Sequence, residues 1–99
     1  GLYAARRDVL ARLVREHLAA WVQPRVPAGG MQMPCVFTCD LPERAAVDAA
    51  RRAGIDLQGL SALYAAEPAE AGFLMGFAAY APQEMVTAVK ALAGVLRRL

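Results

Sequence analysis

Hydrophobic residues recur at helical spacing along the first quarter of the chain. They stand three or four residues apart, at Leu10, Leu13, Val14, His17 and Trp21, and charged residues occupy the other faces. This pattern predicts one amphipathic helix from Leu2 to about Val22. No capping residue precedes the pattern, so we expect the helix to continue upstream in a longer protein.

A strand pattern follows two prolines and the pair Gly29-Gly30. The residues that alternate onto one face are Met31, Met33, Cys35 and Phe37. This period predicts a strand with one face on a core. Pro34 cannot donate a hydrogen bond to a neighbouring strand, so we expect an edge or a bulge there.

The next segment carries the signals of a short helix of roughly three turns. Asp40 stands at the N-cap position with Glu43 three residues later, which is the spacing of a capping box, and Pro42 is tolerated in the first turn. Gly54 stands at the C-cap position, where a left-handed conformation is common.

Two further strands are predicted before the last helix. Ile55, Leu57 and Leu60 supply the first, which is broken by Gly59, and residues 64–71 predict a polar surface loop. The second strand has Phe73, Met75 and Phe77 on one face and Leu74, Gly76 and Ala78 on the other. Because both sets are apolar, we expect this strand to be buried on both sides.

Pro82 opens a final amphipathic helix. Its apolar stripe consists of Met85, Val89, Leu92, Leu96 and Leu99, and its solvated positions include Glu84, Lys90, Arg97 and Arg98. The order of elements predicts a single α+β domain over residues 1–99 with two layers. These layers are a small, mostly antiparallel sheet and helices packed on one of its faces.

Composition narrows the function classes. The 99 residues carry a formal net charge of +2 that is spread along the chain, so we expect no direct contact with nucleic acid. Cys35 and Cys39 would lie roughly 13 Å apart on one strand, too far for a disulfide, and are interpreted as small core residues. Because the sequence shows no signal peptide or membrane span, we expect a cytoplasmic protein.

Few side chains could carry chemistry. His17, the only histidine, has no partner at the spacing of a metal ligand set or a base relay, and is interpreted as a partly buried structural residue. Lys90, the only lysine, has no neighbour that would activate it as a nucleophile. The two cysteines lack the histidines of a zinc site.

Three other features have structural explanations. Gly29-Gly30 lacks the lysine and hydroxyl residue of a P-loop and is interpreted as a turn. Arg97 and Arg98 are interpreted as complements of a helix dipole. Met31 and Met33 are interpreted as core residues.

Five stretches, taken in order, resemble one family. They are YAARRDVLARLVREHL, GGMQMPCVF, LPERAAVDAARRAGIDL, LSALY and GFLMGFAAYAPQEMVTAVKALAGVL. This succession is similar to the C-terminal small domain of fold type I pyridoxal-phosphate proteins, in the form found in MocR-type transcription regulators of the GntR superfamily. The resemblance covers essentially the whole chain.

The resemblance implies a parent protein of three parts. These would be an N-terminal winged helix-turn-helix that binds DNA, a large aminotransferase-like domain that holds pyridoxal phosphate on a lysine, and this small domain closing over it. All cofactor-binding groups would lie in the large domain, so no catalytic, cofactor-binding or metal-binding residue is expected in this chain. The parent would be a cytoplasmic homodimer with no membrane contact.

One family position can be located in this sequence. Aminotransferases of this fold commonly carry, in the strand before the last helix, an arginine that binds the substrate carboxylate, followed by an aliphatic, a small and an aromatic residue. The matching residues are Leu74, Met75, Gly76 and Phe77, so leucine replaces the arginine. Leucine cannot form a bidentate pair with a carboxylate, which disfavours ordinary transamination.

Three functions stay open on the sequence alone. The first is the effector-sensing domain of a MocR-type regulator, with no catalysis by this chain alone. The second is the C-terminal domain of a class I/II aminotransferase. The third is a free-standing sensor or interaction domain.

Overall fold

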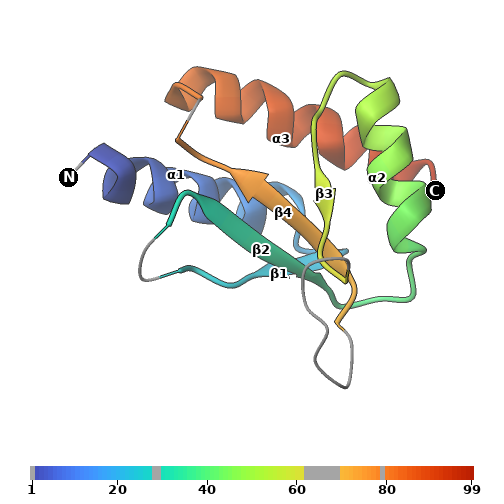
Figure 1. Ribbon diagram of the computed structural model, residues 1–99. Helices are drawn as coiled ribbons and strands as arrows, with labels where there is room; N and C mark the ends of the chain where they lie inside the picture. The colour runs from blue at the N-terminus through green and yellow to red at the C-terminus, as the bar shows by residue number, and fades with distance from the viewer. Residues whose placement is uncertain (1, 28–29, 62–69, 79) are drawn as a thin grey trace.

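The computed structural model describes residues 2–27, 30–61, 70–78 and 80–99 (Figure 1). Within these ranges the elements are α1 (Leu2–His17), β1 (Val22–Pro24), β2 (Gln32–Phe37), α2 (Glu43–Arg52), β3 (Gln58–Gly59), β4 (Gly72–Gly76) and α3 (Pro82–Arg97). The strands form one sheet in the order β1-β2-β4-β3, and every neighbouring pair is antiparallel. The predicted α+β class is confirmed. The loop predicted over residues 64–71 lies mostly outside the described residues.

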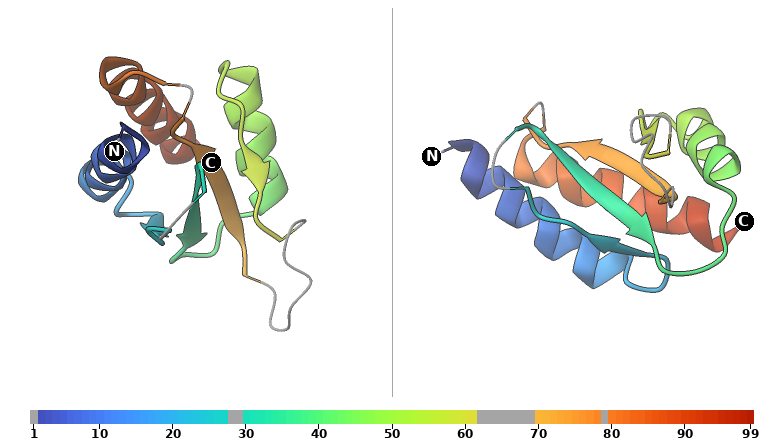
Figure 2. Two further views of the ribbon diagram at one scale, coloured as in Figure 1. Left: turned by 60° about the vertical axis from the view of Figure 1, so that its left-hand side comes forward. Right: turned by 60° about the horizontal axis from the view of Figure 1, so that its bottom comes forward.

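The helices lie on one face of the sheet. Helices α1 and α3 lie side by side, and α2 contacts α3, β3 and β4 beyond the β3 edge (Figure 2). All three helices contribute to one apolar core, together with Met33 and Cys35 of β2 and Phe73 and Met75 of β4. The predicted two-layer arrangement is therefore confirmed, and within the described ranges the opposite face of the sheet carries no helix.

Strand β4 is buried on both sides, as its two apolar sets predict. Phe73 and Met75 point into the core, while Leu74 is only 7% exposed although it lies outside the core cluster. Its edges are also occupied, because β4 pairs with β2 on one side and with β3 on the other. Strand β4 is thus the centre of the fold.

The first helix is shorter than its pattern predicts. It ends at His17, and Val22 lies in β1, a strand that the periodicity did not reveal. The pattern predicts a helix at Val22 because this residue continues the apolar spacing of α1. Pairing with β2 decides otherwise, since Val22 lies opposite Phe37.

Pro34 lies in β2, which has a neighbouring strand on each side. The pairing with β1 ends next to Pro34, so the predicted edge exists only at this point. Its carbonyl accepts a hydrogen bond of 2.8 Å from the backbone N–H of Arg25. The nitrogen of Pro34 faces the same neighbour, since the two groups of one residue point to the same side of a strand. Strand β1 ends at Pro24, so the missing donor of Pro34 coincides with the end of that ladder.

Helix α2 begins later than its capping signal predicts. Its N-cap is Pro42 and no side chain caps it, so the expectation that Asp40 caps it is wrong. Its other end is as predicted: Gly54 has φ of 85°, and Ile55 N–H donates to the carbonyl of Ala50 at 2.9 Å. This is the Schellman arrangement that glycine favours.

Two apolar residues differ from their predicted burial. Met31 precedes β2 and is 54% exposed, although Met33 is fully buried as predicted. Leu99 is 47% exposed because α3 ends at Arg97, before the apolar stripe reaches it. Glu84, predicted to be solvated, is exposed but also accepts a hydrogen bond of 2.8 Å from the N-cap N–H of Ala81.

Replacing Gly72 with alanine should destabilise the fold strongly. An added Cβ would lie 2.0 Å from the backbone oxygen of Cys35, which belongs to the neighbouring strand and cannot move away without disturbing the ladder. We expect the free energy of unfolding in urea to fall by about 2 to 3 kcal/mol.

Gly94→Ala is the matched control for this substitution. The nearest atom to its added Cβ would be an Arg98 side-chain nitrogen at 3.9 Å. Removing glycine from the interior of α3 should raise stability by about 0.5 to 1 kcal/mol. Equal effects of the two substitutions would contradict the packing argument at Gly72.

Candidate functional site on the open face of the sheet

Leu74 projects onto the face of the sheet that carries no helix, which we call the open face. It lies opposite Pro34 of β2 and Gln58 of β3 in the strand register. Its sequence neighbours Phe73 and Met75 point into the core. The alternation of side chains therefore turns Leu74 toward the open face, where only 7% of the residue is exposed.

The register also decides which residues could replace Leu74 in that role. A shift of one residue would select Phe73 or Met75, both in the core, and a shift of two would select Gly72 or Gly76. None of these residues can bind a carboxylate through its side chain. The prediction that leucine replaces the family arginine therefore tolerates an alignment error of one or two residues.

The paired residues of the open face are uncharged, and glutamines lie around an apolar centre. They are Gln23 of β1, Gln32, Pro34 and Val36 of β2, Gly72, Leu74 and Gly76 of β4, and Gln58 of β3. The three glutamines are exposed, and Pro34 and Val36 are half-buried. These strand positions can supply apolar contact and amide hydrogen bonds, but they contain no acid, base or nucleophile.

Glu43 holds the start of β4 in place. Its carboxylate accepts hydrogen bonds of 3.0 Å from the backbone N–H groups of Ser61 and Gly72, and another from the Ser61 hydroxyl. Gly59 leaves room for this carboxylate, because a Cβ there would lie 2.8 Å from one of its oxygens. Glu43, the first residue of α2, is therefore bonded both to the segment that follows β3 and to the first residue of β4.

These contacts change the acidity of Glu43. Burial raises the pKa of the carboxyl. The hydrogen bonds from Ser61, Gly72 and Leu60 together lower it by more, so the pKa falls below the ordinary value of 4.5.

An exposed ion pair, Arg25 with Glu70, links the end of β1 to the chain entering β4. The hydrogen bond from Arg25 lowers the pKa of Glu70.

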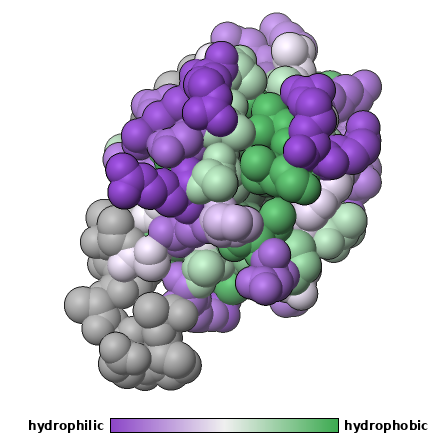
Figure 3. Space-filling view, turned by 90° about the vertical axis from the view of Figure 1, so that its right-hand side faces the viewer, coloured by the Kyte–Doolittle hydropathy of each residue, from purple (hydrophilic) through white to green (hydrophobic). Residues whose placement is uncertain are grey.

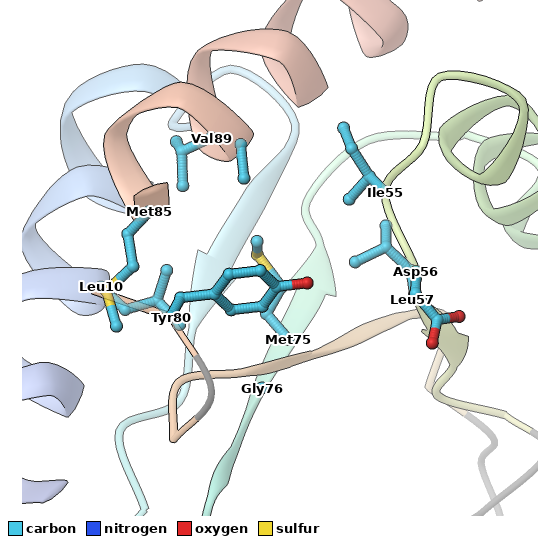
Figure 4. A pocket seen from close by; sticks show the side chains of 10 residues that line it. Leu10, Ile55, Asp56, Leu57, Met75, Gly76, Tyr80, Met85 and Val89 are labelled. Atoms are coloured by element: carbon cyan, nitrogen blue, oxygen red, sulfur yellow. The ribbon is translucent and has the colours of Figure 1, made fainter. Parts of the chain in front are cut away.

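A separate hollow lies between α3 and the chain at residues 53–57. Two adjoining depressions share Ile55, Tyr80 and Ala88, and the larger has a volume of about 460 Å³. Figure 4 shows the ring of Tyr80 lying across the space between α3 and residues 55–57. Its lining contains no histidine, cysteine, lysine or arginine, so this hollow offers few groups for catalysis.

The titratable candidates from the sequence are not assembled into a site. His17 ends α1 with 31% of its side chain exposed, as predicted for a partly buried residue, and its Nε2 lies 3.8 Å from a Glu16 oxygen. Lys90 is exposed on α3. Within the described ranges, no group of three or more histidine, cysteine or acidic residues could hold a metal ion.

The two cysteines have different environments. Both are free thiols, and Cys35 is buried as predicted, which raises its pKa to about 12. The prediction for Cys39 is wrong, because it follows β2 and is exposed, with its sulfur 3.7 Å from the carbonyl oxygen of Trp21. The strand that would have carried it into the core ends at Phe37.

The remaining candidates are consistent with structural roles. Gly30 has φ of 85°, as a turn before β2 requires, and Gly29 lies outside the described residues. Arg97 and Arg98 are exposed at the carboxyl end of α3. None of the helices in the described ranges has the length and apolar character that crossing a bilayer requires.

Comparison with solved structures defines the class of domain. The chain superposes on the kynurenine aminotransferase of Pyrococcus horikoshii with a TM-score of 0.82 and 20% identity, over 97% of this chain and 24% of that one. The α-aminoadipate aminotransferase of Thermus thermophilus gives a TM-score of 0.82 and 14% identity, over 97% of this chain and 25% of that one. The chain therefore has the fold of aminotransferase C-terminal domains.

A sequence relative is more specific. The chain is 32% identical over 91 residues to the probable rhizopine catabolism regulatory protein MocR of Rhizobium meliloti. The match covers 92% of this chain but only 18% of that protein, so the chain spans less than a fifth of its relative. No protein-family model matches the chain. The resemblance to MocR-type, aminotransferase-like proteins that the sequence indicated is confirmed.

Removing the charge of Glu43 should lower stability in a pH-dependent way. Its pKa is lowered in the folded state, so its contribution is present above about pH 4.5 and is lost as the pH falls through the folded value. We expect Glu43→Gln to reduce the free energy of unfolding at pH 7 by about 1 to 2 kcal/mol. The variant should also lose less stability than the parent chain on acidification from pH 6 to pH 3.

Glu16→Gln is a charge-matched control, since Glu16 is an exposed carboxylate that pairs with Arg12 on α1. Urea titrations at several pH values would measure all three proteins. The role given to Glu43 is wrong if its variant keeps the pH dependence of the parent chain.

Proposed function

We propose that the chain is the small, ligand-sensing domain of a pyridoxal-phosphate-binding transcription regulator of the MocR type. The observation that carries this proposal is the similarity to a regulator over 92% of the chain, joined to a fold shared with aminotransferases. The aminotransferases of similar fold include complexes with pyridoxamine phosphate and with a phosphopyridoxyl amino acid, which supports a pyridoxal-phosphate cofactor in the whole protein.

In this proposal the chain contributes a contact surface for the ligand, and the other domains contribute the residues that bind the cofactor and DNA. The lysine that binds the cofactor and the winged helix that binds DNA would lie in other domains of a cytoplasmic homodimer. The small domain would move against the large one when a ligand binds, and this hinge movement would change the arrangement of the DNA-binding domains. Lys90 is exposed and does not line the hollow near Tyr80. The proposal assigns no catalysis to this chain alone.

Leu74 is the residue through which ligand preference would be expressed. It occupies the family position for carboxylate binding and lies on the open face, which we propose to face the cofactor. Losing one member of a buried charged pair costs about 2 to 5 kcal/mol of binding, so an ordinary α-amino acid would be held poorly. A ligand that needs no arginine at this point, or the cofactor itself, fits the uncharged open face better.

A second function is favoured by one observation. Several structures that share the fold are aminotransferases, so the whole protein could be a transaminase that binds its substrate without this arginine. Incubating the full-length protein with amino donors and keto acids separates the two functions. Turnover across a donor panel would favour the enzyme, and no turnover together with specific DNA binding would favour the regulator.

The reading frame that precedes Gly1 should encode a large aminotransferase-like domain and, before it, a winged helix-turn-helix. Sequencing the gene upstream tests this expectation directly. A large domain without a winged helix would favour the aminotransferase. A native start at Gly1 would leave only a free-standing domain and would reject the proposal.

Restoring the arginine should restore binding of amino acids. In the full-length protein with its cofactor, Leu74→Arg should tighten the apparent Kd for an α-amino acid by about 30-fold or more. The Kd would be measured from the change in visible absorbance of the cofactor. Leu74→Gln is the control, because glutamine is polar but cannot pair with a carboxylate through a charged fork. The assignment of Leu74 fails if the two variants bind amino acids equally.

A further inference from the structure

A hollow lies between the carboxyl-terminal halves of α2 and α3, away from the open face of the sheet. We call it the α2–α3 groove, and its lining residues are Ala49, Arg52, Ala53, Val95, Arg98 and Leu99. Its volume is about 390 Å³, within the range of hollows that accept ligand groups. Figure 3 shows the end of the molecule that carries α2 and the C-terminus, where hydrophobic side chains gather between hydrophilic ones.

The floor of the groove is apolar and open. Val95 is buried beneath it, and Ala53 and Leu99 are exposed. Leu99, with 47% of its surface exposed, is among the four large hydrophobic residues exposed in the described part of the chain. Small alanines on α2 leave space for a side chain from another molecule, and such a side chain would cover Leu99.

The rims of the groove are positively charged. Arg52 and Arg98 line it, and Arg97 is the neighbour of Arg98 in sequence. Among the described residues, no acidic side chain lies within ion-pair distance of these three arginines. The acids near α2 are already engaged, since Asp48 pairs with Arg44 and Asp56 pairs with Arg51.

Helix dipoles do not account for all of this charge. The carboxyl ends of α2 and α3 contribute roughly half a negative charge each, about one charge in total. The two arginines that line the groove carry two positive charges, so the groove keeps a net positive potential, and Arg97 lies next to Arg98 in sequence. A binding partner must therefore complement an apolar floor with cationic rims.

We propose that the α2–α3 groove binds an acidic peptide segment that inserts an apolar side chain over Val95 and Leu99 and places carboxylates against Arg52 and Arg98. Charge complementarity selects this occupant. A second copy of the chain docked groove to groove would bring two sets of arginines together, which is unfavourable. The inference stands independently of the proposed ligand-sensing function.

The probe is an acetylated and amidated peptide, Leu-Glu-Glu-Leu-Leu-Glu-Glu, with a second peptide in which glutamine replaces each glutamate. Titration into the isotope-labelled chain, followed by amide chemical shifts, would give both the affinity and the location of binding. We expect the acidic peptide to shift amides of residues 49–53 and 95–99. Added salt should weaken its binding, because the rim contacts are exposed to solvent.

Charge reversal tests the rims. The double substitution Arg52→Glu and Arg98→Glu should weaken binding of the acidic peptide by about tenfold or more. Arg52→Glu alone is compared with Arg44→Glu, which reverses one charge on α2 at a side chain that is 95% exposed and outside the groove. Circular dichroism would show that each variant keeps the fold.

Four outcomes would overturn the proposal. The glutamine peptide could bind as tightly as the acidic one, or the shifted amides could lie elsewhere on the chain. The charge-reversed variant could keep full affinity. Concentration-dependent association of the chain, abolished by the same charge reversal, would assign the groove to a second copy instead.

Discussion

The double burial of β4 is the constraint on which the rest of the structure depends. This strand is paired on both edges, by β2 and β3, and its side chains are buried on both faces. Phe73 and Met75 anchor the sheet to the helices, and the pleat then sends Leu74 to the open face. One backbone geometry thus sets both the core and the position of the candidate site.

Glu43 explains how such a strand can begin in a fixed place. Its carboxylate receives three hydrogen bonds from Ser61 and Gly72, which belong to segments remote from it in sequence. A side chain at position 72 would collide with the backbone of β2, whereas one at position 59 would displace the Glu43 carboxylate from its present place. Polar contacts therefore fix the first residue of β4, and apolar packing stabilises the rest of the strand.

The described residues carry few reactive groups, and the chain matches only part of each longer relative. The paired positions of the open face carry no charge, and Lys90 is solvated on a helix. The chain spans 18% of its regulator relative and about a quarter of the aminotransferases that share its fold. Two different surfaces are available for contact: the uncharged open face around Leu74 and the cationic α2–α3 groove. Because one surface is uncharged and the other is cationic, they would recognise different chemical groups.

Local pattern was enough for features that depend on a residue and its near neighbours. The apolar stripe of α3 up to Leu96, the alternation in β4 and the left-handed Gly54 follow from helical period, strand period and backbone sterics. The resemblance predicts the place of Leu74 in the family pattern. Neither source required knowledge of which segments meet in space.

Tertiary structure decided everything that depends on a partner across the chain. Val22 looks helical until β2 pairs with it, and Glu43 looks like half of a capping box until Ser61 and Gly72 approach its carboxylate. Cys39 and Leu99 have core-like side chains but stand beyond the ends of β2 and α3. The orientation of Leu74 belongs to the same class, because only the register of β4 between its neighbours turns that side chain to the open face. A sequence shows the helical and strand periods and the residues that favour helix caps. Long-range contacts decide where each element ends and which groups the polar side chains bind.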